Sequence, residues 1–268
     1  MTRLRLGAVL VGLLATAALL APVLAPYSPT ALLDLDTLRS APPSLAHPLG
    51  TDLYSRDLLS RLLYGARVSL AIALLAVALS VGVGTATGLV AGYAGGLIDS
   101  VVMRVVDAGL AIPKVFVALV VLALWDEVTP GAIAVILGFT GWFGVARMVR
   151  AEAASVRERE YVAAARVLGV PVRRLLARHV LPNVAGPVIV TATLGVGQVV
   201  LIEAGLSYLG VGVPQPMPSW GNIIADGQHV LLAAPWIAAG AGVAIVLTVL
   251  AFSVLGDGLR EHLDPRSR

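Results

Sequence analysis

Residues 68–92 read VSLAIALLAVALSVGVGTATGLVAG, a stretch without a charged side chain. An α-helix needs roughly 20 apolar residues to cross the ~30 Å hydrocarbon core of a bilayer, and this stretch is long enough. Five other apolar segments resemble it, at residues 6–26, 106–125, 131–149, 184–205 and 236–256. None has the alternating polarity of a membrane β-strand. Because helices satisfy their backbone hydrogen bonds internally, the sequence predicts an all-α polytopic membrane protein with about six transmembrane helices.

The composition of the chain also favours the bilayer as its solvent. Apolar residues make up 58% of the 268 residues and charged residues only 13%, whereas soluble domains carry about 25% charged residues. Cysteine is absent, which excludes disulfides and thiolate metal sites. The net charge is +3, but most basic residues flank apolar segments. We therefore expect membrane lipid, and no nucleic acid, as a partner of these residues.

The arginines predict the orientation of the spans. Eight of them lie in residues 147–183, whereas the connections 126–130 and 206–235 contain none. Basic loops stay on the cytoplasmic side of a membrane. With six spans, we expect four segments on that side: the N-terminus, residues 93–105, the loop 147–183 and the tail 259–268.

Residues 27–67 are expected on the extracytoplasmic side, although they carry four arginines: Arg39, Arg56, Arg61 and Arg67. Residues 1–26 are predicted to be an uncleaved first transmembrane helix. The alternative is a cleaved signal peptide, against which Pro22 and Pro26 argue.

The remaining core, residues 68–258, contains two irregular features. The third span, 106–125, includes Pro113, which either kinks the helix or marks its true beginning. In the external connection 206–235, three prolines and three glycines fall within residues 210–221. That density of turn formers predicts a compact ordered loop rather than a helix.

Two acidic residues near the spans are candidates for a translocation path or gate. Glu203 lies near the outer end of the fifth span, and intramembrane acids are functional candidates by default. The alternative for Glu203 is a local cap or ion pair at the interface. For Asp107, at the start of the third span, we expect an ion pair with Arg104 three residues earlier, or more loosely between Arg104 and Asp99.

The basic block predicts two helices joined by a tight turn. Residues 150–168 are adequate or good helix formers, and Gly169 suits the position just past a helix end. A second helix is expected over residues 171–179, opened by a proline and ended by Leu181 and Pro182. The small side chains of the first helix and the apolar side chains of the second, ringed by arginines, are typical of a protein docking surface: Ala163, Ala164 and Ala165 on the first, and Val172, Leu175 and Leu176 on the second. The alternative is a basic loop attracted to anionic lipid headgroups.

Motifs of catalysis are missing from the chain. The sole lysine, Lys114, lies in AIPKVF, which is not a nucleotide-binding P-loop. The four histidines are far apart in sequence and lack metal-ligand spacing. We therefore expect no enzyme activity, no metal and no cofactor in this chain; any nucleotide that energises transport would bind to another chain.

The block closely resembles the inner-membrane permease subunits of bacterial ABC importers. Their signature is E-A-A-x3-G-x9-I-x-L-P in a cytoplasmic loop. Aligned on the glycine, it matches Ala164, Ala165, Gly169, Leu181 and Pro182. Two positions depart from the signature: Ala163 replaces the glutamate, with Glu160 one helical turn earlier, and His179 replaces the isoleucine.

Four further motifs resemble the dipeptide, oligopeptide and nickel branch, in the second permease of the pair. They are HPLGTD (47–52) with the residues up to Arg67, LSYLG (206–210), PSWG (218–221) and GDGLR (256–260). A glycine is usual in that branch where Ser55 stands. The branch usually has the RHVLPN form at 178–183.

The resemblance implies a permease in the bacterial plasma (inner) membrane, with both termini cytoplasmic. Its partners would be a second homologous permease, two ATPase subunits that bind ATP and Mg²⁺, and an extracytoplasmic solute-binding protein. The loop 147–183 would be the coupling element that docks on an ATPase. Peptides are the expected solutes; nickel or another small solute, a secondary transporter working alone and a non-transporting scaffold are the alternatives.

Overall fold

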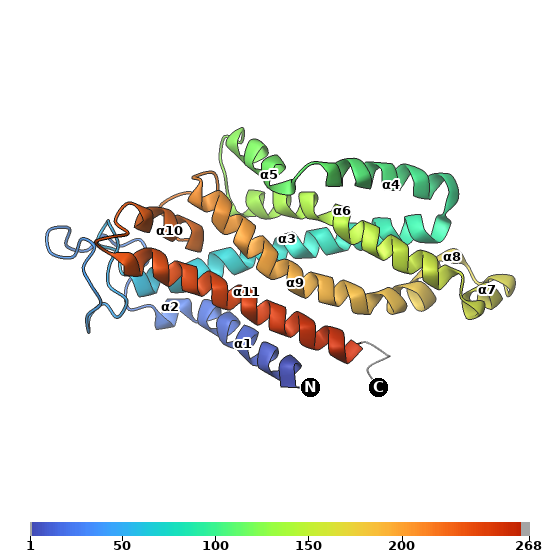
Figure 1. The fold of residues 1–268 in the computed structure, drawn as a ribbon, viewed down its shortest axis with the longest axis horizontal. Coiled ribbons are helices and arrows are strands. Elements are labelled where there is room, and N and C mark those ends of the chain that lie inside the picture. The colour runs from blue at the N-terminus through green and yellow to red at the C-terminus, as the bar shows by residue number, and fades with distance from the viewer. Residues whose placement is uncertain (1, 264–268) are drawn as a thin grey trace.

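The structure, a computed structural model, describes residues 2–263 and consists of helices and their connections over that range (Figure 1). By length and composition, five of these helices suffice to cross a membrane. They are α1 (Thr2–Leu19), α3 (Leu58–Ala94), α6 (Pro130–Arg157), the continuous helix Val172–Tyr208 that contains α9 (Leu181–Tyr208), and α11 (Pro235–Leu263). The predicted all-α polytopic membrane protein is confirmed.

A sixth span is broken in two. Helices α4 (Gly96–Ala111) and α5 (Lys114–Ala123) are together long and apolar enough for one span, and they meet at an angle of 75°. Ile112 and Pro113 between them are extended, with ψ angles of 123° and 121°. Proline forces this geometry, because it lacks an N–H and pushes the preceding residue out of the helical region. The kink predicted at Pro113 is confirmed.

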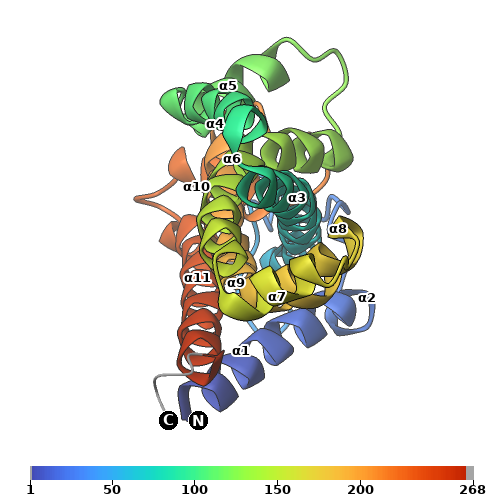
Figure 2. The ribbon, with the colours of Figure 1, turned by 90° about the vertical axis from the view of Figure 1, so that its right-hand side faces the viewer.

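Helix α3 packs closely along α6 and α9 (Figure 1). A Cβ atom at Gly88 of α3 would lie 2.8 Å from the Val149 Cβ atom of α6, so the two backbones approach more closely than a larger residue allows. Small residues at such crossings are typical of membrane helix pairs. Helix α1 lies beside α11 in both views (Figures 1 and 2), and Arg3 Nη1 is 3.0 Å from Glu261 Oε1. The end of the predicted tail 259–268 lies outside the described residues.

The two ends of the bundle carry different structures. Residues 25–57 and α10 (Trp220–Gln228) form one end, called the α10 end below, with α2 (Ala21–Leu24) leading into it. Helices α7 (Glu160–Val167) and α8 (Val172–Leu175) form the opposite end (Figures 1 and 2). The compact loop predicted from the prolines and glycines is present up to Ser219, which caps α10 by accepting a hydrogen bond from Asn222 N at 3.3 Å. Helix α10 itself was not predicted.

Two arginines at the α10 end lie in a buried ion cluster. Arg56 Nε is 2.7 Å from Asp52 Oδ2, and Arg61 Nη1 is 2.9 Å from Asp226 Oδ2 of α10. Arg56 also contacts Asp226 at 3.0 Å, and Arg61 also contacts Asp52. Both guanidinium groups form ion pairs inside the protein, so they are not free basic charges of a loop. Their presence in the segment expected outside is thereby explained.

The ion pair expected between Arg104 and Asp107 is wrong. Asp107 pairs instead with Arg147 of α6, and Asp99 accepts hydrogen bonds from Arg150 of α6, from its Nε at 2.8 Å. Both acids reach a neighbouring helix rather than their own. These two pairs join α4 to the half of α6 that lies nearer to α7 and α8.

Candidate functional site: the tip and the central cavity

The basic block forms a short helical tip between α6 and α9, defined here as residues 158–175. Helix α6 continues from the membrane to Arg157 and ends there, so the single helix predicted over residues 150–168 is wrong. The chain turns at Glu158 and Arg159 and begins α7 at Glu160. The turn lets Val162 fold back onto α6, which a straight helix would not allow.

A cluster of buried valines fastens the tip to both long helices. Val162 of α7 packs with Val156 of α6 and with Val180 and Val184 of the α9 side. All four are 0–1% exposed. Burying a valine side chain contributes about 1.5 kcal/mol or more, so these contacts stabilise the attachment of the tip to α6 and α9.

Gly169 makes the turn between α7 and α8. Its φ angle is +75°, in the left-handed region that favours glycine. Gly169 N donates to Arg166 O at 3.0 Å and Val170 N donates to Ala165 O at 3.1 Å, the two hydrogen bonds of a Schellman helix end. A Cβ atom there would meet nothing within 4 Å. The predicted turn is confirmed, and glycine is required for its backbone angle rather than for space.

The predicted end of the second helix at Leu181 and Pro182 is wrong. Helix α8 passes through a π-helical turn, η1 (Leu176–Val180), directly into α9. Pro182 stands in the first turn of α9. A wider π turn just before it accommodates a residue that has no N–H to donate to the preceding turn.

Asn183 of α9 joins the first residues of the tip to the π-helical turn η1, and its role was not predicted. Its Nδ2 atom donates to Tyr161 Oη at 3.1 Å and to His179 O at 2.7 Å, and its Oδ1 atom accepts from Arg159 Nη1 at 3.1 Å. The tyrosine ring also lies against the His179 ring, with centroids 6.1 Å apart. The position of Asn183 at the end of the RHVLPN motif was the signal available in the sequence.

The outer surface of the tip is apolar at its centre. Val167 is 89% exposed and Leu168 is 82% exposed, although neither was among the predicted docking residues. Val172 is exposed as expected, but Leu175 is fully buried, contrary to the expectation that it is offered to a partner. The predicted small residues Ala163 and Ala164 are exposed, and Ala165 and Leu176 are half-buried.

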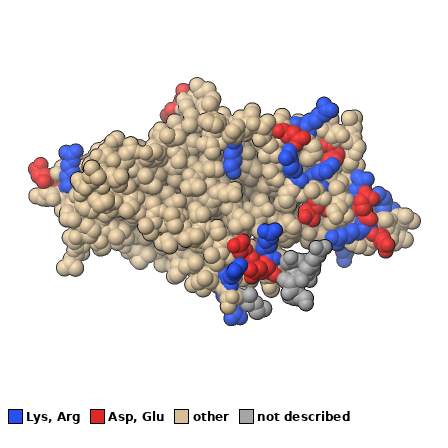
Figure 3. Space-filling view, in the orientation of Figure 1, with Lys and Arg blue, Asp and Glu red and all other residues tan. Residues whose placement is uncertain are grey.

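The remaining predicted docking residues lie at the start of the tip and just beyond its end. Glu160 is exposed in the first turn of α7, where a carboxylate is favoured by the helix dipole, and it has no ion pair among residues 2–263. Leu181 and Pro182 are exposed, and His179 is half-buried. Figure 3 shows Lys, Arg, Asp and Glu side chains gathered toward this end, whereas the middle of the face is almost uncharged.

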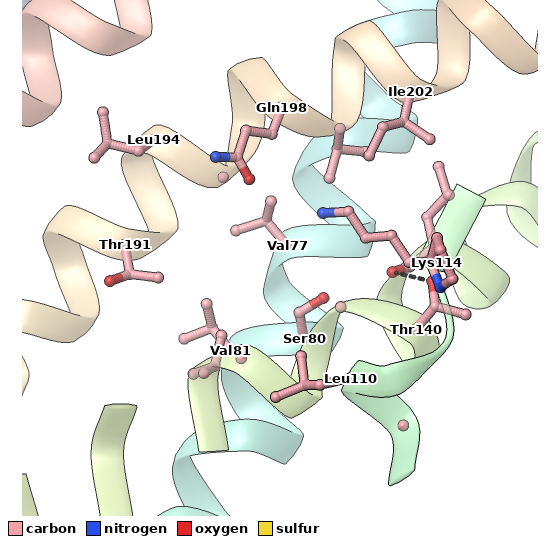
Figure 4. A pocket seen from close by; sticks show the side chains of 18 of the residues that line it. Val77, Ser80, Val81, Leu110, Lys114, Thr140, Thr191, Leu194, Gln198 and Ile202 are labelled. Carbon is pink, nitrogen blue, oxygen red and sulfur yellow. Dashed lines mark hydrogen bonds between the residues drawn. The ribbon is translucent and has the colours of Figure 1, made fainter. Parts of the chain in front are cut away.

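A cavity of about 430 Å³ lies in the middle of the bundle (Figure 4). Its walls come from α3, α6, α9 and the break between α4 and α5, including Ile112 and Pro113. Irregular backbone at membrane depth is tolerated where it lines a cavity, which fits the position of the break. The cavity has five polar side chains in its wall: Ser80, Lys114, Thr140, Thr191 and Gln198.

Neither predicted path residue lies in the wall of this cavity. Glu203 is fully buried between helices, where it accepts hydrogen bonds at 2.7 Å from Ser69 and from Ser207. Asp107 is exposed and paired with Arg147. Their neighbours Ile202 and Gly109 line the cavity instead. A role for Glu203 or Asp107 in a path stays a prediction.

The same two helices therefore connect the tip with the cavity. Helix α6 provides the Thr140 side of the wall and ends at the tip, and α9 provides the Gln198 side and begins there. Both are held to the tip by the valine cluster.

Comparison with known proteins gives this arrangement a context. Residues 84–268 match the family described as binding-protein-dependent transport system inner membrane component. The chain is 40% identical over 227 residues to a dipeptide transport system permease protein of Alkalihalophilus pseudofirmus, covering 84% of this chain and 74% of that one. It is 38% identical over 266 residues to an oligopeptide transport system permease protein of Bacillus subtilis, covering 98% and 85%.

A putative peptide transport system permease protein of Brucella suis is 41% identical over 264 residues, covering 98% of this chain and 87% of that one. Matches of this extent, together with several helices able to span a membrane, identify a multi-pass transport subunit. The chain belongs to the family of binding-protein-dependent transport system inner membrane components.

Proposed function

We propose that this chain is the permease subunit of an ATP-driven importer of dipeptides or oligopeptides and forms half of its translocation path. The relatives are named as dipeptide, oligopeptide or peptide permeases, which supports peptides as the solute class. The observation that carries the mechanism is the tip, whose exposed Val167 and Leu168 stand at the end of helices that reach the cavity.

The tip is proposed to dock on an ATPase subunit. Its apolar centre, ringed by charged side chains, has the composition of the core and rim of a protein interface. ATP and Mg²⁺ would bind to two such ATPase subunits, and closure of that pair would displace the tip. Since the tip is fastened to α6 and α9 by the valine cluster, both helices would move as rigid bodies and change access to the cavity.

The same proposal fixes the orientation. The tip end and both termini lie in the cytoplasm of a bacterial cell, and the chain lies in its plasma (inner) membrane. The arginines of residues 147–183 favour this side. The α10 end then faces the extracytoplasmic solute-binding protein, and a second homologous permease completes the path.

The experiment is uptake by the reconstituted importer, with the solute-binding protein outside and ATP inside the proteoliposomes. Labelled dialanine should enter only with ATP and the binding protein present, and a catalytically inactive ATPase should abolish entry. Nickel uptake without peptide uptake would establish the alternative solute. Solute movement by the purified chain alone, down an ion gradient, would establish a secondary transporter and overturn the proposal.

A further inference from the structure

The wall of the central cavity carries one charge. Its polar side chains come from three helices and the α4–α5 break, and Lys114 is the sole ionisable residue among them (Figure 4). Lys114 follows the break directly, and its side chain extends into the cavity from that side, with Gln198 of α9 pointing in from across it. The cavity is therefore electropositive.

Three of these polar side chains have no side-chain hydrogen bond or ion pair among residues 2–263. Ser80 Oγ donates to Gly138 O at 3.0 Å and Thr140 Oγ1 donates to Ile136 O at 2.9 Å. By contrast, Lys114, Thr191 and Gln198 make no side-chain hydrogen bond or ion pair within residues 2–263. The groups left free are thus one ammonium, one hydroxyl and one amide, all facing the same space.

An unpaired ammonium at this depth is unfavourable. Charged groups removed from water are normally paired, and intramembrane lysines face cavities in which a partner is found. Lys114 is half-buried and no carboxylate lines the cavity. A solute that carries an anionic group would supply this partner on entering the cavity. The volume of about 430 Å³ falls within the ~300–1,000 Å³ range of small-molecule sites.

We propose that Lys114 binds the carboxylate of the solute during translocation, with Gln198 and Thr191 binding its adjoining polar groups. This inference rests on the proposed function, since it makes Lys114 a residue that selects peptides with a free C-terminal carboxylate. An ammonium and a carboxylate form a charge-assisted hydrogen bond. An amide and a hydroxyl supply both donors and acceptors to a peptide group.

The test compares dialanine with dialanine amide, which lacks the carboxylate, in proteoliposomes holding the complete importer. Lys114→Met should lower ATP-driven uptake of dialanine about tenfold, the loss that corresponds to one charge-assisted hydrogen bond. Uptake of the amide should stay within about twofold of the unaltered importer on the same reasoning. Lys114→Arg should keep the preference for the acid, because it keeps the charge.

Arg104→Met provides the matched control. Arg104 is a cation of the same broken span, but it is exposed and absent from the cavity wall. Its removal should leave the ratio of acid to amide uptake unchanged. Because the binding protein is the same in every variant, its own preference cancels when ratios are compared between variants.

Direct contact is measured separately, without the binding protein, by ¹³C-dimethylation of lysines in the purified importer. Dimethylation keeps the positive charge. The NMR signal absent from the Lys114→Arg importer belongs to Lys114, and it should shift with millimolar dialanine and not with the amide. This measurement decides the matter if the binding protein rejects the amide.

The contrary results are distinct. Equal loss of acid and amide uptake in Lys114→Met would assign Lys114 to an ion pair with the second permease and overturn the inference. Unchanged dialanine uptake in that variant, or a Lys114 signal that ignores dialanine, would also overturn it while peptide import stands. Absence of any peptide uptake by the unaltered importer would instead refute the proposed function.

Discussion

Substitutions at Gly169 should uncouple ATP hydrolysis from transport in a graded order. The φ angle of +75° is costly for residues with a Cβ atom, by about 1–2 kcal/mol for an ordinary L-residue. Because a Cβ atom would meet nothing within 4 Å, the backbone angle alone sets the cost. We expect Gly169→Asn to be nearly neutral, Gly169→Ala to cost about 1 kcal/mol and Gly169→Val about 2 kcal/mol.

Gly169→Pro should abolish the turn. Proline fixes φ near −65°, and it removes the N–H that donates to Arg166 O at 3.0 Å. The loss of both exceeds about 3 kcal/mol. The assay is the number of dialanine molecules imported per ATP hydrolysed in proteoliposomes, which should fall in the order Asn, Ala, Val, Pro. Membrane insertion should be unaffected, since the turn lies outside the spans.

Gly210 at the α10 end is a matched control. Its φ angle is +82°, a Cβ atom there would also meet nothing within 4 Å, and the same pair of hydrogen bonds ends its helix. The same substitutions at Gly210 carry the same local cost but should leave ATPase docking intact. Coupled transport by Gly169→Pro at the unaltered ratio would refute the argument for the tip.

Three stability predictions concern the helix packing and the α10 end. Ser55 has a φ angle of +58°, and its buried Oγ atom lacks a hydrogen bond in the described structure. Ser55→Gly should therefore raise the free energy of unfolding by about 1 kcal/mol, measured by thermal unfolding in detergent. Asp226→Ala should lower the free energy of unfolding by about 2 kcal/mol in the same assay. The loss is smaller than the ~3–5 kcal/mol for removing the sole partner of a buried charge, because Asp52 still pairs with both arginines. An unchanged Tm would contradict the buried cluster. Gly88→Leu should cost about 3 kcal/mol by forcing α3 from α6, whereas Gly82→Leu, where a Cβ atom meets nothing within 4 Å, should not, and equal effects would contradict the close packing.

The sequence was sufficient for features that one residue or one apolar run determines. The length of the apolar segments predicts the spans. Pro113 breaks the third span because proline lacks an N–H. Gly169 follows the end of α7 because glycine readily adopts the positive φ angle that this turn requires. The usual glycine at the position of Ser55 also has a physical reason, since φ there is +58°.

Features that depend on how helices pack could not be predicted. Leu175 and Leu168 are both leucines among arginines, yet one is fully buried and the other 82% exposed, because the tip folds back onto α6 and α9. Asp107 pairs with Arg147 across to α6 rather than with Arg104 on its own helix. In both cases a partner distant in sequence determines the outcome, and local spacing carries no information about it.

The arrangement of residues around the cavity could not be predicted from the sequence either. Lys114 is visible in the sequence as the sole lysine beside Pro113, but only the fold brings Gln198 of α9 to the opposite wall. Glu203 is an acidic residue within a span, as expected of a residue in a translocation path. Its carboxylate, however, accepts hydrogen bonds from Ser69 and Ser207 between packed helices.

The most direct test of the tip as the ATPase contact is site-specific photocrosslinking. The chain has no cysteine, so in a Leu168→Cys variant a benzophenone maleimide labels this chain at position 168 alone, and the labelled chain is then assembled into the importer. Leu232→Cys, at a fully exposed leucine of the α10 end, is the control. Illumination should join the label at position 168, and not that at position 232, to an ATPase subunit, with a yield that changes on ATP binding. No ATPase adduct from position 168, or an adduct from position 232 alone, would contradict the account.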